Sequence, residues 1–136
     1  LELMDEDAVL FEPLSKAYAM KENTEEERRE KERVMEQATL DACKVPLEIM
    51  EECCKAIGYL EEYLKKGNPL LVSDVGVGAL CCKAALLGAA MNVYINTKTM
   101  KNRGTADAMN EKTSSMSQEY SEKADMIYES VLKQLR

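Results

Sequence analysis

Residues 73–96 read SDVGVGALCCKAALLGAAMNVYIN, and this stretch decides the fold. From Val75 to Ile95 the only strongly polar residues are Lys83 and Asn92, so a helix formed here is apolar nearly all round. Such a helix either spans a membrane or is enclosed by other helices. Lys83 in mid-span and the many Gly and Ala residues favour enclosure, because small side chains let neighbouring helices approach closely. We predict a central buried helix of a bundle, covered by neighbours that can include a second subunit.

The start of this helix carries the most informative carboxylate. Ser73 has the side chain of a good N-cap, and Asp74 falls in the first turn, where the helix dipole favours negative charge. Asp74 therefore has two readings. It either stabilises the helix start, or it serves as a base or hydrogen-bond anchor at the mouth of a pocket.

The sequence around this stretch is also helical in pattern. Apolar spacing predicts one helix over residues 1–20 and a last helix over residues 105–135. Thr24 with Glu27 forms a capping box that opens another helix, and Pro46 either kinks that helix or begins the next one, which ends at Gly67. We predict one all-α domain over residues 1–136.

Composition narrows the function classes. A net charge of −7, from 18 basic and 25 acidic residues, argues against nucleic acid or an anionic membrane as partner. The five cysteines include no CxxC pair and the chain has no His, so no zinc or other metal site is expected. We expect the cysteines to be reduced core residues of a cytoplasmic protein, and no signal peptide is visible.

The absence of His also limits the chemistry. Ser/His and Cys/His nucleophile systems are excluded within these residues, so proton transfer must use Asp, Glu, Lys, Tyr or Cys. Lys83 is either a side chain that reaches the surface or a buried charge near a site. Asn92 and Asn96 lie one turn apart near the helix end, and their amides suit either an inter-helix hydrogen bond or the polar edge of a ligand ring.

An ordered set of motifs resembles a known family. The set is Asp5-Glu6-Asp7-Ala8-x-x-Phe11, Tyr18, Thr24-Glu25-Glu26-Glu27, Ala42-x-x-Val45-Pro46-Leu47, Gly67-Asn68-Pro69-x-x-x-Ser73-Asp74-Val75-Gly76-Val77 and Asn92-Val93-x-Ile95-Asn96. In order and spacing it resembles the cyclodeaminase/cyclohydrolase family of folate enzymes over roughly residues 4–100. The final helix agrees with the family in character only.

The resemblance implies an all-helical domain that forms a homodimer and binds a tetrahydrofolate derivative in a groove. Its implied activity is methenyltetrahydrofolate cyclohydrolase or formiminotetrahydrofolate cyclodeaminase, with no tightly bound cofactor. Asp74 becomes the candidate base or anchor and Lys83 an electrostatic helper. The residues that would position the substrate are Asn68, Ser73, Asn92, Asn96 and Asp7.

The chain departs from the family pattern in two places. Relatives carry a Pro-Gly-Gly-Gly-Ser-type segment near the N-terminus that is not present here, so we expect this chain to match the C-terminal two-thirds of such a domain. Tyr94 stands where relatives often have Arg, which removes a positive charge that could meet a ligand carboxylate. A non-catalytic helical dimerisation or scaffold module is the alternative that the small-residue stripe and the charged helices fit equally well.

Overall fold

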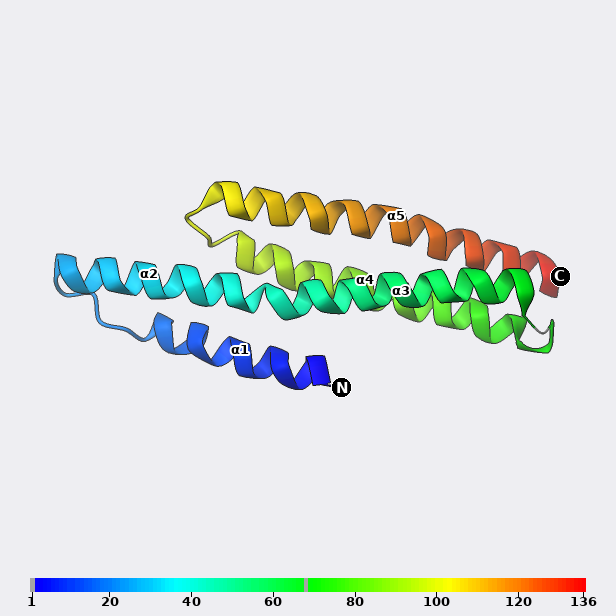
Figure 1. Cartoon of the computed structure of the whole chain (residues 1–136), viewed down its shortest axis with the longest axis horizontal. Helices are drawn as coiled ribbons and strands as arrows, with labels where there is room; N and C mark the ends of the chain where they lie inside the picture. The colour runs from blue at the N-terminus through cyan, green and yellow to red at the C-terminus, as the bar shows by residue number, and fades with distance from the viewer. Residues whose placement is uncertain (1, 68) are drawn as a thin grey trace.

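The computed structural model describes residues 2–67 and 69–136, and these residues form a helical bundle without strands (Figure 1). One 3₁₀ turn, η1, covers Pro69–Leu71. The α-helices of the described residues are α1 (Glu2–Tyr18), α2 (Glu25–Ala42), α3 (Lys44–Lys66), α4 (Val72–Thr97) and α5 (Arg103–Leu135). The all-α prediction is confirmed.

Helices α2 and α3 follow one another nearly end to end in one long rod (Figure 1). The rod begins at the predicted capping box, in which the Glu27 amide donates to Thr24 Oγ1 at 3.1 Å and Glu27 Oε2 accepts from the Thr24 amide at 3.3 Å. It is interrupted at Cys43, and Pro46 lies in the first turn of α3, where its missing N–H costs no helical hydrogen bond. Of the two readings for Pro46, the new helix start is therefore correct.

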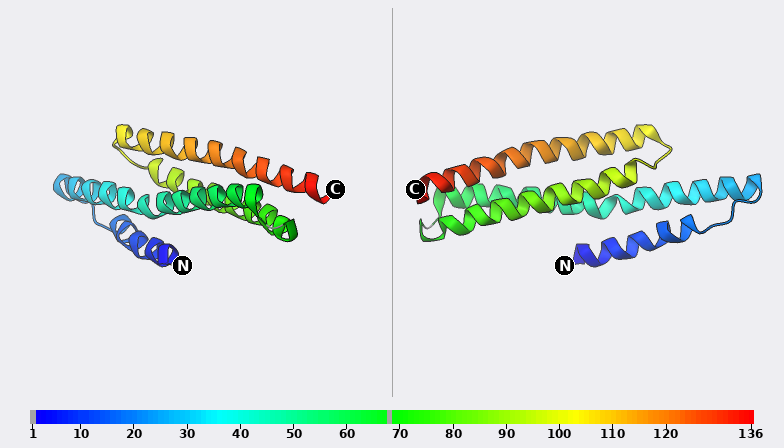
Figure 2. Two further views of the ribbon diagram at one scale, coloured as in Figure 1. Left: turned by 45° about the vertical axis from the view of Figure 1, so that its right-hand side comes forward. Right: turned by 180° about the vertical axis from the view of Figure 1, so that it is seen from behind.

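The main core lies where α3, α4 and α5 pack lengthwise, and α1 lies against α2 and the start of α3 (Figure 2). Its largest fully buried members include Met50, Ile57, Leu86 and Val93. Each such side chain contributes about 1.5–3 kcal/mol by leaving water. A smaller cluster of Leu14, Ala38 and Ala42 attaches α1 to α2. The bundle therefore holds α4 firmly along one side.

The turn between α3 and α4 differs from the prediction. Helix α4 begins at Val72 with Leu71 as its N-cap, because η1 runs directly into it. Ser73 therefore lies inside the first turn and caps nothing, so its prediction as N-cap was wrong. Gly67 does end α3, but its backbone is not left-handed. Glycine suits this position because the Tyr63 carbonyl oxygen lies so close that a Cβ would collide with it.

Helix α4 is buried along one side only. Ala79 and Val93 have no exposed surface, whereas Val77 is 60% and Met91 is 71% exposed on the other side. The prediction that neighbours enclose this helix is thus wrong for the single chain, because α3 and α5 cover only about half of its circumference. Pro69–Thr97 has a mean hydropathy of 1.8 over its most apolar window and could cross a membrane by length and composition, a test that core helices of soluble proteins also pass.

Candidate functional site

The exposed face of α4 carries three of the predicted site residues, namely Ser73, Asp74 and Asn92. Asp74 and Asn92 are both exposed and stand eighteen residues apart, which is about five whole turns, so they point in the same direction about 27 Å apart. The two side chains cannot both contact one small ring. They mark the two ends of one long exposed face.

A cavity lies in the middle of this face. It is open to solvent, has a volume of about 460 Å³ and is lined by the start of α1, by α3 and by α4. Its lining is mostly apolar and comprises Leu3, Met4, Ile49, Glu52, Cys53, Ala56, Cys81, Cys82 and Ala85. Asp74 stands seven residues before Cys81 and Asn92 seven residues after Ala85, which is about 10 Å of helix on each side. The polar groups therefore flank an apolar hollow.

The remaining predicted substrate residues are placed as follows. Asp7 is half-buried on α1, one turn beyond the cavity wall at Leu3. Ser73 is exposed beside Asp74. Asn68 lies outside the described residues. Because α1 and the second half of α4 run in the same direction (Figure 2), Asp7 and Asn92 both lie past the cavity toward the α4 C-terminus.

Lys83 is on the opposite side of α4 from Asp74. The two residues are nine positions apart, which places their side chains about half a turn from each other around the helix. Lys83 Nζ lies 2.6 and 2.7 Å from the two carboxylate oxygens of Asp125 on α5. The structure therefore does not bring Lys83 and Asp74 together, and it ties the Lys83 charge to the α4–α5 interface.

Asn96 has an internal partner. Its Nδ2 donates to the Ala42 carbonyl oxygen at 3.2 Å, so the inter-helix hydrogen bond foreseen for this amide is present. The bond joins the end of α4 to the break between α2 and α3. Asn96 thus orients the helix end from which Asn92 projects, one turn away.

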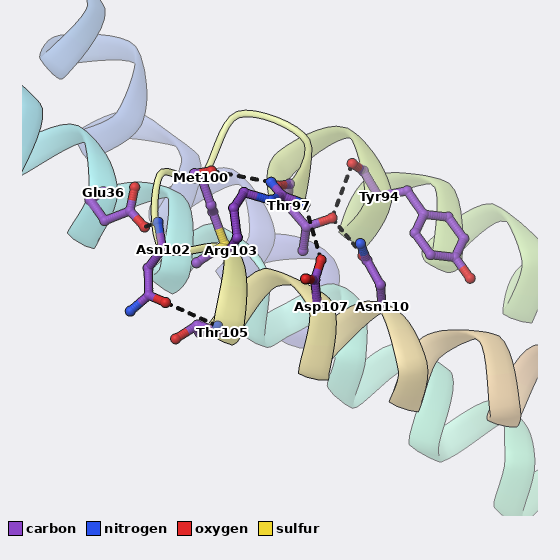
Figure 3. A network of polar contacts seen from close by, with 9 residues as sticks. All are labelled: Glu36, Tyr94, Thr97, Met100, Asn102, Arg103, Thr105, Asp107 and Asn110. Carbon is purple, nitrogen blue, oxygen red and sulfur yellow. Dashed lines mark hydrogen bonds and ion pairs between the residues drawn. The ribbon is translucent and has the colours of Figure 1, made fainter.

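A polar network fixes the same end of α4 (Figure 3). Thr97 Oγ1 donates to Asn110 Oδ1 at 2.6 Å across the α4–α5 interface. Arg103 donates to the Thr97 and Met100 carbonyl oxygens at 2.9 and 3.2 Å. Glu36 accepts the backbone N–H groups of residues 101 and 102. Sequence reasoning missed these bonds because they join residues from three elements.

Two features of the α4 face were missed from the sequence. The adjacent Cys81 and Cys82 diverge by about 100° around the helix, so Cys81 is exposed while Cys82 is half-buried toward α3. The cysteines were taken together as core, which holds for the buried Cys43 and Cys54; Cys53 and Cys82 are half-buried against the core, and Cys81 is exposed. The second feature is a heptad-spaced seam, exposed to at least 38% at each large apolar position, formed by Val77, Leu80, Ala84, Leu87, Met91 and Tyr94.

Titration behaviour separates the thiols. Burial raises the pKa of Cys43 and of Cys54 to about 11. Burial also raises the pKa of Cys53 and Cys82, and the neighbouring charge of Cys82 raises the pKa of Cys53 further. Among the described residues no group of three or more His, Cys, Asp or Glu side chains is arranged to hold a metal ion.

Comparison with known proteins gives a consistent set of relatives. Residues 1–115 match the model of the formiminotransferase-cyclodeaminase family. A methenyltetrahydrofolate cyclohydrolase of Methylorubrum extorquens is 31% identical over 129 residues, which are 95% of this chain and 62% of that protein. The formimidoyltransferase-cyclodeaminase of Mus musculus is 33% identical over 92% of this chain and 23% of its own length.

The fold has a solved counterpart. The crystal structure of formiminotetrahydrofolate cyclodeaminase from Thermotoga maritima matches with a TM-score of 0.71 and 25% identity, over 98% of this chain and 61% of that one. This chain therefore spans about three-fifths of the length of the cyclohydrolase and of the cyclodeaminase that it matches.

Proposed function

This chain belongs to the formiminotransferase-cyclodeaminase family, and we propose that it acts in folate one-carbon metabolism. The proposed substrate is a tetrahydrofolate derivative, and the proposed reaction is hydrolysis of methenyltetrahydrofolate or cyclodeamination of formiminotetrahydrofolate. The names of two relatives state these activities, and both relatives match nearly the whole of this chain.

One observation carries the location of the site. Among the described residues, the α4 face combines an apolar cavity with exposed polar side chains on either side of it, namely Asp74 and Asn92. Ligand sites of small molecules are typically apolar hollows with a few polar groups that fix orientation. A folate has this character, with flat apolar rings and polar edges. Asp7, one turn beyond the cavity on α1, supplies a further acceptor.

The two candidate reactions ask the same of this face. In the hydrolysis, water adds to the one-carbon unit and a carbon–nitrogen bond breaks to open the ring. In the cyclodeamination, a folate nitrogen attacks that carbon and ammonia leaves. Each passes through a tetrahedral centre and needs proton transfer, for which a carboxylate is suited. We assign the base or anchor role to Asp74 and leave Lys83 outside the site, since its charge is paired with Asp125 on the opposite side.

Ligand binding provides the first test. A ligand that binds only the folded chain at 100 times its Kd stabilises it by about 2.7 kcal/mol, which is roughly 10 °C in Tm for a chain of this size. We expect 5-formyltetrahydrofolate to raise Tm in this way. An unchanged Tm at saturating concentration would favour the scaffold alternative.

Turnover provides the second test and separates the two reactions. The assays follow loss of methenyltetrahydrofolate absorbance and release of ammonia from formiminotetrahydrofolate. Removing a general base typically costs about 100-fold or more, so Asp74→Asn should lose activity by that factor while the fold stays intact. Glu129→Gln on the exposed side of α5 is the matched control and should retain the rate. Full activity in Asp74→Asn would remove this carboxylate from the mechanism.

The homodimer, the cytoplasmic location and the lack of a tightly bound cofactor are also parts of the proposal. The heptad-spaced seam supports the homodimer, because a row of apolar side chains at alternating spacings of three and four is the pattern by which helices pair. In an antiparallel pair, small residues near the middle, such as Ala84, would meet and allow close approach. The seam lies on the α5 side of the exposed face and leaves the cavity side free.

Self-association can be measured directly. Ala84→Glu places a charge on the seam without touching the core of the single chain, since Ala84 is exposed. Sedimentation should show a dimer for the wild type and a monomer for this variant. Ser114→Glu, at an exposed position of α5, should remain a dimer. A wild-type chain that is monomeric at all concentrations would contradict the homodimer.

A further inference from the structure

Three of the five cysteines meet at the cavity described above. Cys53 comes from α3, whereas Cys81 and Cys82 come from α4. The other two cysteines are buried away from this cavity. Nothing in the proposed folate chemistry uses these thiols, so their convergence calls for its own explanation.

Cys53 and Cys82 are neighbours across the α3–α4 interface. Both line the same cavity, and the charge of an ionised Cys82 raises the pKa of Cys53. Helices α3 and α4 also pack against each other one turn of α4 before Cys82, where a Cβ added at Gly78 would lie 3.3 Å from Leu60 Cδ2. Close approach matters because a disulfide requires Cα atoms about 4.4–6.8 Å apart.

We propose that Cys53 and Cys82 form an oxidisable dithiol, at which a small disulfide reagent produces an interhelical disulfide in the wall of the cavity. In the first step one thiolate of the pair attacks the small disulfide, forms a mixed disulfide and releases one small thiol. In the second step the other thiolate attacks the protein sulfur of that mixed disulfide, and a second small thiol leaves. The two protein sulfurs are oxidised, and the small disulfide is reduced to two thiols.

Cys81 cannot replace Cys82 in this reaction. Its side chain points about 100° away from that of Cys82 and is exposed, and the thiol whose charge acts on Cys53 is Cys82. Exposure makes Cys81 the site of simple addition, and the half-buried pair the site of ring closure. The disulfide would join α3 to α4 beside the apolar hollow and change its lining.

The test uses the full chain and oxidised glutathione. Cys53 and Cys54 share one tryptic peptide, as do Cys81 and Cys82, so the double variant Cys54→Ala/Cys81→Ala makes the link unambiguous. After incubation at pH 8.5 and thiol alkylation, mass spectrometry should find the two peptides joined. The complementary variant Cys53→Ala/Cys82→Ala keeps one cysteine in each of the same peptides and should show at least a tenfold lower yield of that link.

The pH dependence adds a second readout. Both thiols are largely protonated at neutral pH because their pKa values are raised, and only thiolates attack disulfides. The rate of link formation should therefore rise about tenfold per pH unit between pH 7 and 8.5. Two results would overturn the proposal. One is an equal yield of the link in the two double variants. The other is no link in Cys54→Ala/Cys81→Ala under conditions in which Cys81 of the wild type takes up glutathione. Circular dichroism verifies that both variants are folded.

Discussion

A glycine in α4 tests how tightly this helix packs against α5. A Cβ added at Gly76 would lie 2.9 Å from Val131 Cγ1 and 3.3 Å from Val131 Cβ. Val131 is 2% exposed and β-branched, so its side chain has little freedom to turn away within a helix. Gly76→Ala therefore combines a gain in helix propensity with a steric conflict. A matched variant is needed to separate the two effects.

Gly58→Ala is that matched variant, because Gly58 is also inside a helix and nothing lies within 4 Å of its added Cβ. Replacing a helical Gly by Ala stabilises by about 1 kcal/mol, and we expect Gly58→Ala to show this gain. Overpacking at a tight interface costs about 1–3 kcal/mol. Gly76→Ala should therefore unfold with a free energy about 1–3 kcal/mol below that of Gly58→Ala.

Urea unfolding of the full chain, followed by circular dichroism, measures this difference. With a slope of about 1–3 kcal/mol per molar urea, the two midpoints should differ by about 1 M. Val131→Ala should cost less in the Gly76→Ala chain than in the wild type, because the added methyl group then occupies freed space. If Gly76→Ala is stabilised as much as Gly58→Ala, the described packing of α4 on α5 is incorrect.

Two further predictions concern charge and ionisation. The pKa of Cys43 and of Cys54 is raised from 9.0 to about 11 in the folded chain, so the unfolded chain loses these protons first as pH rises. The stability that the two protonated thiols contribute is therefore complete below pH 9 and should be lost as pH rises toward 11. The loss should be smaller in Cys43→Ala. A stability that stays constant over that range would contradict the burial of these thiols. Lys83→Met should lower the free energy of unfolding by less than about 1 kcal/mol, because both partners of the ion pair with Asp125 are partly exposed. The variant should keep the turnover rate. A large loss of turnover with intact stability would return Lys83 to the catalytic site.

Local sequence signals predicted most of the elements. The capping box at Thr24, the first-turn proline at Pro46 and the glycine at the end of α3 each act within a few residues, so the sequence was sufficient to place them. The start of α4 was misplaced by two residues because η1, a short turn without a strong signature, runs into the helix. The presence of each helix followed from the spacing of apolar residues, whereas its exact first and last residues depended on local hydrogen bonds.

The candidate site was less accessible to sequence reasoning. An apolar composition showed that α4 needs cover, but it could not show which side α3 and α5 leave open. The position of Lys83 around the helix was computable from its spacing, yet its partner Asp125 lies on another helix that the sequence does not place. Cys81 could likewise be placed on α4, but not the residues of α1 and α3 that line the same cavity. Asn96 illustrates the same limit, since its partner, the Ala42 carbonyl, belongs to a break between two helices far away in the chain.

The central claim is that the exposed face of α4 binds a reduced folate. Backbone amide chemical shifts of the full chain, recorded by NMR during titration with 5-formyltetrahydrofolate, test it most directly. We predict the largest shift changes along this face, from Asp74 through Cys81 and Ala85 to Asn92, with smaller changes at the start of α1. Saturable changes confined to α5, or no changes at all, would contradict the claim.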